Sequence, residues 1–265
     1  MERILLKNFK ENLSSSDRVN SFILVEKAAK NPIELKNGDF DLLIKDLNNN
    51  QKLVINVYED ANAKISFFAK TNIELLDVEI NLFKNANVVC YFADFTLDKN
   101  KINVNAYLKE EGSSFNWHLA SLTSNQDKKD ITVSVLHQVG NTYAKVDNYG
   151  VCRDSGKLLF AGTSTINKGS KESRTYQNAK IMVFDKDCVA TAKPVLKIDE
   201  NDIQANHAAV VGKVNDEHLF YLTSRGLSEN QAKEIITFGY LKPILEGFIE
   251  DEVKQEITDL IEGRK

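Results

Sequence analysis

The feature that most constrains the fold of this chain is a strand-like unit that recurs along it. Five segments rich in Asn, Gly, Ala and Asp each lead into a run of β-forming residues. They are ANAKISFF from Ala61, NANVVCYF from Asn85, EGSSFNWH from Glu111, VGNTYAKV from Val139 and KGSKESRT from Lys168. Their starts recur at a nearly regular spacing, with a period in the twenties. A period of this length favours a solenoid, in which each coil buries its apolar face by stacking on the next.

Within these units apolar and polar residues alternate, which is the period of a half-buried β-strand. The pattern runs from about residue 50 to residue 215, and the residues expected on one face include Leu53, Ile55, Val57, Phe115, Trp117, Leu119, Ile131, Val133 and Val135. An antiparallel sandwich with strands about every 8 to 12 residues would show the same alternation. The repeat spacing favours the solenoid over this alternative.

The pattern becomes helical after Gly226. Ser228 and Gln231 have the spacing of a capping box, Gly239 can end a first helix, and Pro243 suits the first turn of a second. An amphipathic apolar stripe then continues through Leu245, Phe248, Ile249, Val253, Ile257, Leu260 and Ile261. We therefore expect a short N-terminal segment over 1–32, a β-helix core over 33–226 and a small C-terminal helical domain over 227–265. Residues 16–30 fit a helix, and Phe40–Ile44 fits a strand.

Composition excludes several classes of protein. The net charge is −4, and the last helical stretch, from Ser228, holds nine acids against five bases, so the remainder is neutral and lacks the basic stripe of a nucleic-acid-binding protein. No apolar run is long enough to span a bilayer, and the first residues lack the apolar core of a signal peptide. Three distant cysteines do not form the framework of a secreted disulfide fold. We expect a cytoplasmic protein with no nucleic-acid or membrane partner.

Residues with catalytic potential are few. The sequence contains no GxSxG, P-loop, GxGxxG or HExxH motif, so nothing argues for an enzyme. His207 fits either a hydrogen-bonded residue of a core or interface, or a metal ligand. Cys188, which acids flank, fits either a small apolar filler or a ligand. Cys90 and Cys152 are expected in the core, His137 on an inward face, His118 on an outward face, and His218 in a turn.

The segment from Lys180 to Phe248 resembles the C-terminal region of the SufB/SufD family of iron–sulfur cluster assembly proteins. The motif is KPVLKI, then ANHAAVVGKV, then LFYLTSRGL. The matching residues are Lys193, Pro194, Leu196, Ile198, His207, Ala208, Gly212, Phe220, Tyr221, Leu222, Ser224, Arg225, Gly226, Leu227 and Ala232. Weaker matches upstream are His137, Thr142, Gly150, Asp154, Phe160, Gly162, Lys168, Gly169 and Gln177, with Ala144 in place of the family's serine. The resemblance covers about residues 131–250.

This resemblance implies a right-handed parallel β-helix followed by C-terminal helices. It also implies a scaffold, not an enzyme, that pairs with SufB through the end of its β-helix and docks a SufC-type ATPase through its helices. The residues that it implicates in partner binding are Phe220, Tyr221, Ser224, Arg225, Gly226, Leu227, Ala232, Ile235 and Ile236. No cofactor is expected to be tightly bound, although an iron–sulfur cluster could form transiently at a subunit interface.

The details favour a short SufD. Ala208 stands where SufB has an acid, and the proposed SufD cluster ligand corresponds to His207. Cys188 departs from SufD, because it falls about where SufB has its proposed ligand cysteine. The helical domain that usually precedes the β-helix is nearly missing from this sequence, so its functions are not carried over. Two alternatives stay open: a SufB-like homodimer that nucleates clusters itself through Cys188 and His207, and a β-helical carbohydrate-active enzyme.

Overall fold

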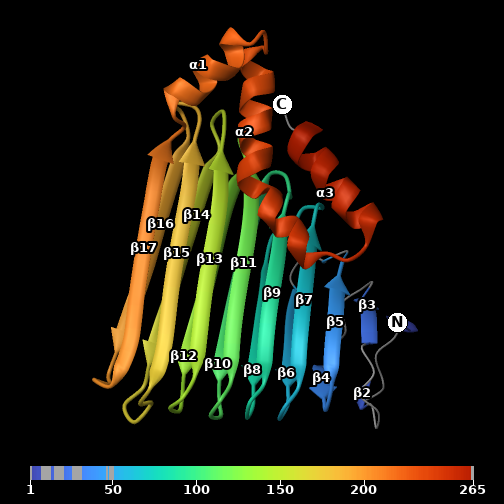
Figure 1. The fold of residues 1–265 in the computed structure, drawn as a ribbon, viewed down its shortest axis with the longest axis vertical. Coiled ribbons are helices and arrows are strands. Elements are labelled where there is room, and N and C mark those ends of the chain that lie inside the picture. The colour runs from blue at the N-terminus through green and yellow to red at the C-terminus, as the bar shows by residue number, and fades with distance from the viewer. Residues whose placement is uncertain are drawn as a thin grey trace.

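The computed structural model describes residues 2–6, 13–14, 21–25, 32–45, 47 and 51–263, with side chains from residue 32 onward. Within these residues the chain forms a β-solenoid built from two parallel sheets, to which a small helical region is attached (Figure 1). The solenoid and helical tail that the sequence predicts are confirmed. The antiparallel sandwich is wrong, because every strand pairing that the structure describes is parallel.

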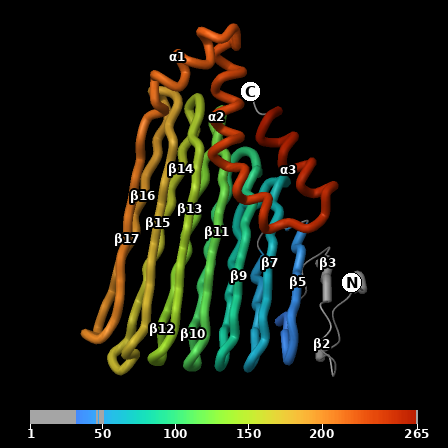
Figure 2. The backbone as a smooth tube through the Cα atoms, in the orientation of Figure 1, coloured from blue at the N-terminus to red at the C-terminus, as the bar shows by residue number. Residues whose placement is uncertain are grey.

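Successive strands alternate between the two sheets, so each turn of the solenoid adds one strand to each sheet (Figure 2). The first sheet contains β1 (Glu2–Leu6), β3 (Ser21–Val25), β5 (Asp39–Ile44), β7 (Asn62–Ala69), β9 (Asn87–Asp94), β11 (Ser114–Thr123), β13 (Tyr143–Cys152), β15 (Ser173–Val183) and β17 (Ile203–Lys213). The second contains β2 (Leu13–Ser14), β4 (Ile33–Lys36), β6 (Gln51–Val57), β8 (Leu76–Leu82), β10 (Lys99–Leu108), β12 (Lys128–His137), β14 (Lys157–Ile166) and β16 (Val189–Ile198). The five repeated segments of the sequence lead into β7, β9, β11, β13 and β15.

The turns of the solenoid become longer along the chain. In the second sheet, Gln51 pairs with Leu76, Leu76 with Ile102, and Ile102 with Ile131, so each of these turns takes more residues than the one before it. The last turn, in which Phe160 pairs with Ala192, is longer than all three. Figure 1 shows the strands lengthening in the same direction, from β5 to β17.

The corners before the strands of the first sheet contain residues with a left-handed backbone. Asn85 (φ 54°), Gly112 (φ 75°) and Asn141 (φ 52°) occupy equivalent places in three successive turns. Asn and Gly tolerate this conformation best, which explains why the repeated segments are rich in them. The corners stack through backbone bonds, since the Asn85 amide donates to Glu111 and the Gly112 amide to Asn141, both at 3.0 Å.

The inward-facing side chains form one continuous apolar core between the two sheets. Aromatic rings fill its centre: Phe67 and Phe92 stack at 5.3 Å between centroids, and Trp117 lies 5.7 Å from Phe92. Trp117 also donates its indole N–H to Asn148 at 3.0 Å. The alternating residues named above for β6, β11 and β12 are all buried, as the sequence predicts.

The helical region folds back over the first sheet, where it forms a second apolar core. It consists of α1 (Asp216–Ser224), α2 (Glu229–Leu241), the short 3-10 helix η1 (Lys242–Gly247) and α3 (Asp251–Gly263). Val253, Ile257 and Ile261 of α3 pack with Phe68 of β7 and with Phe95, which directly follows β9. Among the described residues, no helix is both long and apolar enough to cross a membrane.

Several local expectations need correction. Ser21–Val25 is strand β3, not helix, and the rest of the expected helix over 16–30 lies outside the described residues. Helix α2 continues through Gly239 to Leu241, because nothing in its packing forces a stop there. The strands begin before residue 33, and the first helix begins at Asp216, capped by Asn215, before the expected boundary at 227. The capping box of Ser228 with Gln231 and the proline in the first turn of η1 are confirmed.

Candidate functional site

The last coil of the solenoid, formed by β16 and β17, is its wide end, and no described strand covers it. Among the described strands, β17 is hydrogen-bonded only to β15, and β16 only to β14, so both present a free edge. Four valines remain exposed there: Val189, Val195, Val210 and Val211. Pro194 lies within β16, where its missing N–H is tolerated because an edge strand need not donate on both sides. A free strand edge with exposed apolar residues is suited to binding another chain.

His207 lies in the middle of this open end. It pairs in register with Gln177 of β15, whose side chain is buried and donates to Ser164. The alternation therefore puts His207 on the inward face. The residue is nevertheless exposed, because no further coil covers β17.

Cys188 does not accompany His207. It directly precedes β16 and lies where the strands of the first sheet finish, at the level of Cys152 and Lys213. His207 is six residues back along β17 from Lys213, which is about 20 Å at the rise of a strand. Among the described residues, no group of three or more His, Cys, Asp or Glu side chains could hold a metal. His207 and Cys188 therefore lie too far apart to ligate the same metal ion within one chain.

A second exposed surface lies on the helical region. Helix α1 has no buried residue, and Phe220 and Tyr221 are 73% and 56% exposed. Ile235 on α2 is also exposed. Large apolar side chains so accessible on a short helix indicate a contact surface for another protein.

This surface rests on a rigid base. Lys233 of α2 pairs with Asp185 of the solenoid at 3.0 Å, and the Ser66 hydroxyl donates to the Gly247 carbonyl at 2.6 Å. Gly247 packs so tightly that an added Cβ would lie 2.2 Å from the ring of Tyr91. Lys70 and Glu256 form a further ion pair to α3. Helix α2, η1 and α3 are therefore attached to the first sheet.

Comparison with known proteins identifies the family. Residues 21–240 match the model described as SUF system FeS cluster assembly, SufBD core domain. The chain belongs to the SufBD family.

Individual relatives agree with this assignment. The iron–sulfur cluster assembly protein SufD of Bacillus subtilis is 28% identical over 139 residues, which are 52% of this chain and 32% of that protein. A SufBD family protein of Staphylococcus saprophyticus is 24% identical over 190 residues, 71% of this chain and 41% of the relative. One of Mycobacterium leprae is 31% identical over 134 residues, 51% of this chain and 15% of the relative. The matched region thus spans less than half of each relative.

The SufBD motif residues around α1 separate into exposed and buried groups. Ser224 and Arg225 are exposed, and the Arg225 guanidinium lies 5.2 Å from the centre of the Tyr221 ring. Gly226 has φ of +93° and open space around it, so its role is to let the backbone turn between α1 and α2. Leu227 is half-buried.

The remaining two predicted contact residues lie on the inner side of α2. Ala232 is fully buried, and Ile236 packs against the second apolar core. Their side chains therefore help to hold the helix in place and are not part of its exposed face.

The other histidines and cysteines fall as follows. His137 faces inward and is fully buried, as expected, with Nδ1 2.7 Å from the Thr142 hydroxyl; burial lowers its pKa to about 4. Cys90 and Cys152 are buried, also as expected. His118 is half-buried against Tyr91, since the helices cover the outer side of its strand. His218 lies in α1 and not in a turn.

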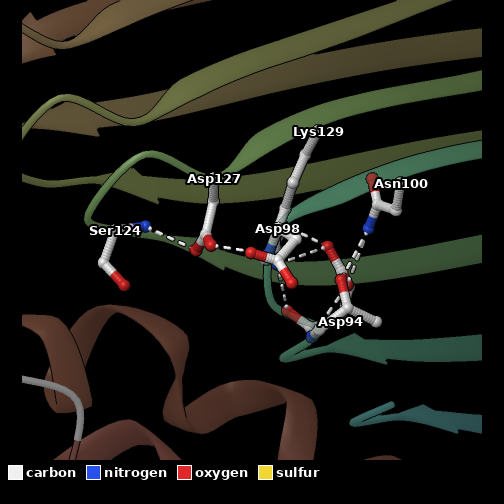
Figure 3. Close-up of polar contacts among 8 residues, drawn as sticks. Asp94, Asp98, Asn100, Ser124, Asp127 and Lys129 are labelled. Atoms are coloured by element: carbon white, nitrogen blue, oxygen red, sulfur yellow. Dashed lines mark hydrogen bonds and ion pairs between the residues drawn. The ribbon is translucent and has the colours of Figure 1, made fainter. Parts of the chain in front are cut away.

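A buried charged cluster near the helical region has no signal in the sequence pattern (Figure 3). The Lys129 ammonium lies 3.0 Å from the Asp94 carboxylate, and both side chains are fully buried. Ser121, Thr96 and Asn100 complete the hydrogen bonds of this carboxylate. Protein donors surround the carboxylate and exclude solvent from it. The cluster connects β9, β10, β11 and β12, so we interpret it as structural.

Proposed function

We propose that this SufBD family member is a scaffold subunit of the SUF iron–sulfur cluster assembly complex, most like SufD, and acts in the cytoplasm. In this proposal the wide end of the solenoid pairs with a SufB-type scaffold, and the helical region docks a SufC-type ATPase. The observation that carries the proposal is the uncovered edge of β16 and β17. At this edge the valines Val189, Val195, Val210 and Val211 are exposed to solvent.

The proposal that β16 and β17 pair with a partner is supported by their unpaired backbone groups, since each strand has a hydrogen-bonded neighbour on one side among the described strands. A parallel strand in a sheet interior is hydrogen-bonded on both sides, whereas β17 has a neighbour on one side. Val210 and Val211 add apolar area next to this edge. A partner that contributes a strand would satisfy the backbone groups and cover the valines together.

The docking surface for the ATPase is supported by the exposure of Phe220, Tyr221 and Ile235 and by the rigid base beneath them. Aromatic side chains have few rotatable bonds and lose little conformational entropy on binding, which favours a strong contact. Arg225, stacked on Tyr221, adds a positive charge at the edge of this surface.

The iron–sulfur cluster is cargo in this proposal, and it would form between subunits. His207 is exposed on the face that meets the partner and could contribute one imidazole ligand. The remaining ligands would have to come from the partner and from inorganic sulfide. Cys188 is too far from His207 to share such a site within one chain.

Co-purification with each partner tests the proposal. The intact chain is expected to bind a SufB-type scaffold and a SufC-type ATPase. Val211→Asp should weaken scaffold pairing by at least about tenfold and leave ATPase binding unchanged, since a carboxylate would be desolvated at the interface. Phe220→Ala should weaken ATPase binding and leave scaffold pairing unchanged.

Leu97→Ala provides the matched control, because Leu97 is an exposed apolar residue outside both surfaces. Equal binding by all three variants would contradict the proposal. If the chain forms a stable homodimer through Val211 and does not bind the scaffold, the SufB-like alternative replaces it.

A further inference from the structure

Cys152 and Cys188 are far apart in the sequence but meet at one end of the solenoid. The thiol of Cys152 donates to the Gly156 carbonyl at 3.1 Å, and the thiol of Cys188 donates to the Asp154 carbonyl at 3.6 Å. Both thiols therefore contact the same short turn between β13 and β14. Cys188 also packs against the apolar core cluster that contains Cys152.

The backbone holds the two cysteines in this arrangement. Cys152 is the last residue of β13, and its carbonyl accepts from the Phe184 amide at 3.0 Å. On the other side, the Val189 amide donates to the Gly156 carbonyl at 2.9 Å, which places Cys188 beside that turn. The loop that carries Cys188 is thus attached at one end to β13 and at the other end to the turn between β13 and β14.

The two thiols differ in access. Cys152 is fully buried, whereas Cys188 is half-buried and reaches solvent. Burial, together with the neighbouring Cys188, raises the pKa of the Cys152 thiol. An oxidant arriving from solvent therefore meets Cys188 first, and Cys152 is in place to react second.

The Cys188 loop also contacts the helical region. Its Asp185 carboxylate accepts from the Asp154 amide at 2.7 Å and from Lys233 of α2 at 3.0 Å. The Asp185 carbonyl in turn accepts from the Cys188 amide at 3.3 Å. One residue thereby connects the cysteine loop to the helix that supports the exposed apolar surface.

We propose that Cys152 and Cys188 are a redox-modification site that closes to a disulfide and strengthens the attachment of α2 to the solenoid through Asp185. The oxidant is a low-molecular-weight disulfide. The site is independent of the proposed partners, because all of its bonds lie within one chain.

The chemistry proceeds by two exchanges. The Cys188 thiolate attacks one sulfur of the small disulfide, forming a mixed disulfide and releasing one small thiolate. The Cys152 thiolate then attacks the Cys188 sulfur and releases the second small thiolate. The two protons lost by the cysteines are taken up by the two leaving thiolates, so the protein loses two hydrogens and the small disulfide is reduced to two thiols. The second step is favoured because it occurs within the molecule.

Peptide mapping tests the site directly. The purified chain is incubated with oxidised glutathione, its remaining thiols are alkylated after denaturation, and the digest is analysed by mass spectrometry. We expect a peptide linking Cys152 to Cys188, an intact mass lower by about 2 Da before alkylation, and alkylated Cys90. A stable glutathione adduct on Cys188 without the cross-link, or no reaction at all, would overturn the proposal.

Variants provide the controls. Cys90→Ser removes the other buried thiol and should leave the cross-link unchanged. Cys152→Ser should trap the mixed disulfide on Cys188, because the second thiol is gone, and Cys188→Ser should prevent all reaction in the folded protein. A glutathione adduct on Cys152 in the Cys188→Ser variant would contradict the order of the two steps.

Hydrogen exchange tests the connection to the helix. Amides of Glu229–Leu241 should exchange at least about threefold more slowly in the oxidised protein than in the reduced one, because the loop beneath them is pinned. In the Lys233→Gln variant, which lacks the ion pair to Asp185, this difference should disappear. Equal exchange of oxidised and reduced wild-type protein would overturn the coupling to α2.

Discussion

The middle and the wide end of the solenoid have the same sequence pattern but very different environments. In β12, the alternate residues Ile131, Val133 and Val135 are all buried. In β17, Ala209 and Val211 occupy the same kind of position and remain exposed. Alternation thus determines which way a side chain faces. Whether that side chain is covered depends on the next coil, and no described strand lies beyond β16 and β17 to cover the wide end.

The largest expected difference between the two regions is in apolar truncation. Phe92→Ala, in the centre of the core, should lower the free energy of unfolding by about 4 kcal/mol, since it removes a stacked ring and leaves a cavity. Val211→Ala, at the wide end, should change it by less than about 0.5 kcal/mol. Urea unfolding followed by circular dichroism measures both. A large loss for Val211→Ala would mean that the end coil is already packed without a partner.

The buried ion pair offers the second comparison. Lys129→Met should cost about 3 kcal/mol, because it leaves the Asp94 carboxylate buried without its counter-charge. Lys128→Met is the matched control, since the adjacent Lys128 is exposed and should tolerate the change. Equal stability of the two variants would show that the buried pair contributes little.

The pH dependence of this pair has a defined sign. Burial alone would raise the pKa of Asp94, but Lys129 and the hydrogen bonds from Ser121 and Thr96 outweigh burial and lower it. Its contribution to stability is therefore present above the unfolded-state value of about 3.9 and is lost as the pH falls through the lower folded-state pKa. In Lys129→Met the buried carboxyl takes up a proton more readily. The stability difference between variant and wild type should therefore shrink in acid, and a constant difference across pH would contradict this assignment.

The smallest expected effect compares two glycines. A Cβ on Gly162 in β14 would lie 2.1 Å from the Val133 carbonyl oxygen, whereas a Cβ on Gly212 in β17 would meet no atom within 4 Å. Gly162→Ala should therefore cost about 2 kcal/mol, and Gly212→Ala should be nearly neutral in the isolated chain. If Gly212→Ala weakens scaffold pairing while leaving stability unchanged, the wide end is the interface that we propose.

The sequence was most informative where structure is local. Strand alternation, the repeated corners and the capping box at Ser228 depend on residues close together in the chain, and each is confirmed. Ser21–Val25 was misassigned because Val19, Phe22 and Ile23 form a short apolar run that fits either a helix or a strand. Pairing with the strands of the neighbouring coils, β1 and β5, makes this segment a strand. That pairing cannot be predicted from the segment alone.

The candidate site was harder to predict because it depends on how the coils stack. His207 and Cys188 are both candidate ligands in the sequence but lie at different heights on the solenoid. Asp94 and Lys129 are 35 positions apart and meet through the stacking of coils. The turns lengthen along the chain, so a fixed repeat does not place such pairs. The family motif identified the end strands and α1 but could not show that Ala232 is turned inward.

The lengthening of the turns also limits how copies of this molecule can assemble. The turn from Ile33 to its partner Ile55 is much shorter than the turn from Phe160 to its partner Ala192. If the wide end of one copy stacked on the shorter turns of another, much of the wide end would stay uncovered. Open-ended polymerisation into filaments is therefore disfavoured, whereas contact between two wide ends would give a closed pair that cannot grow further.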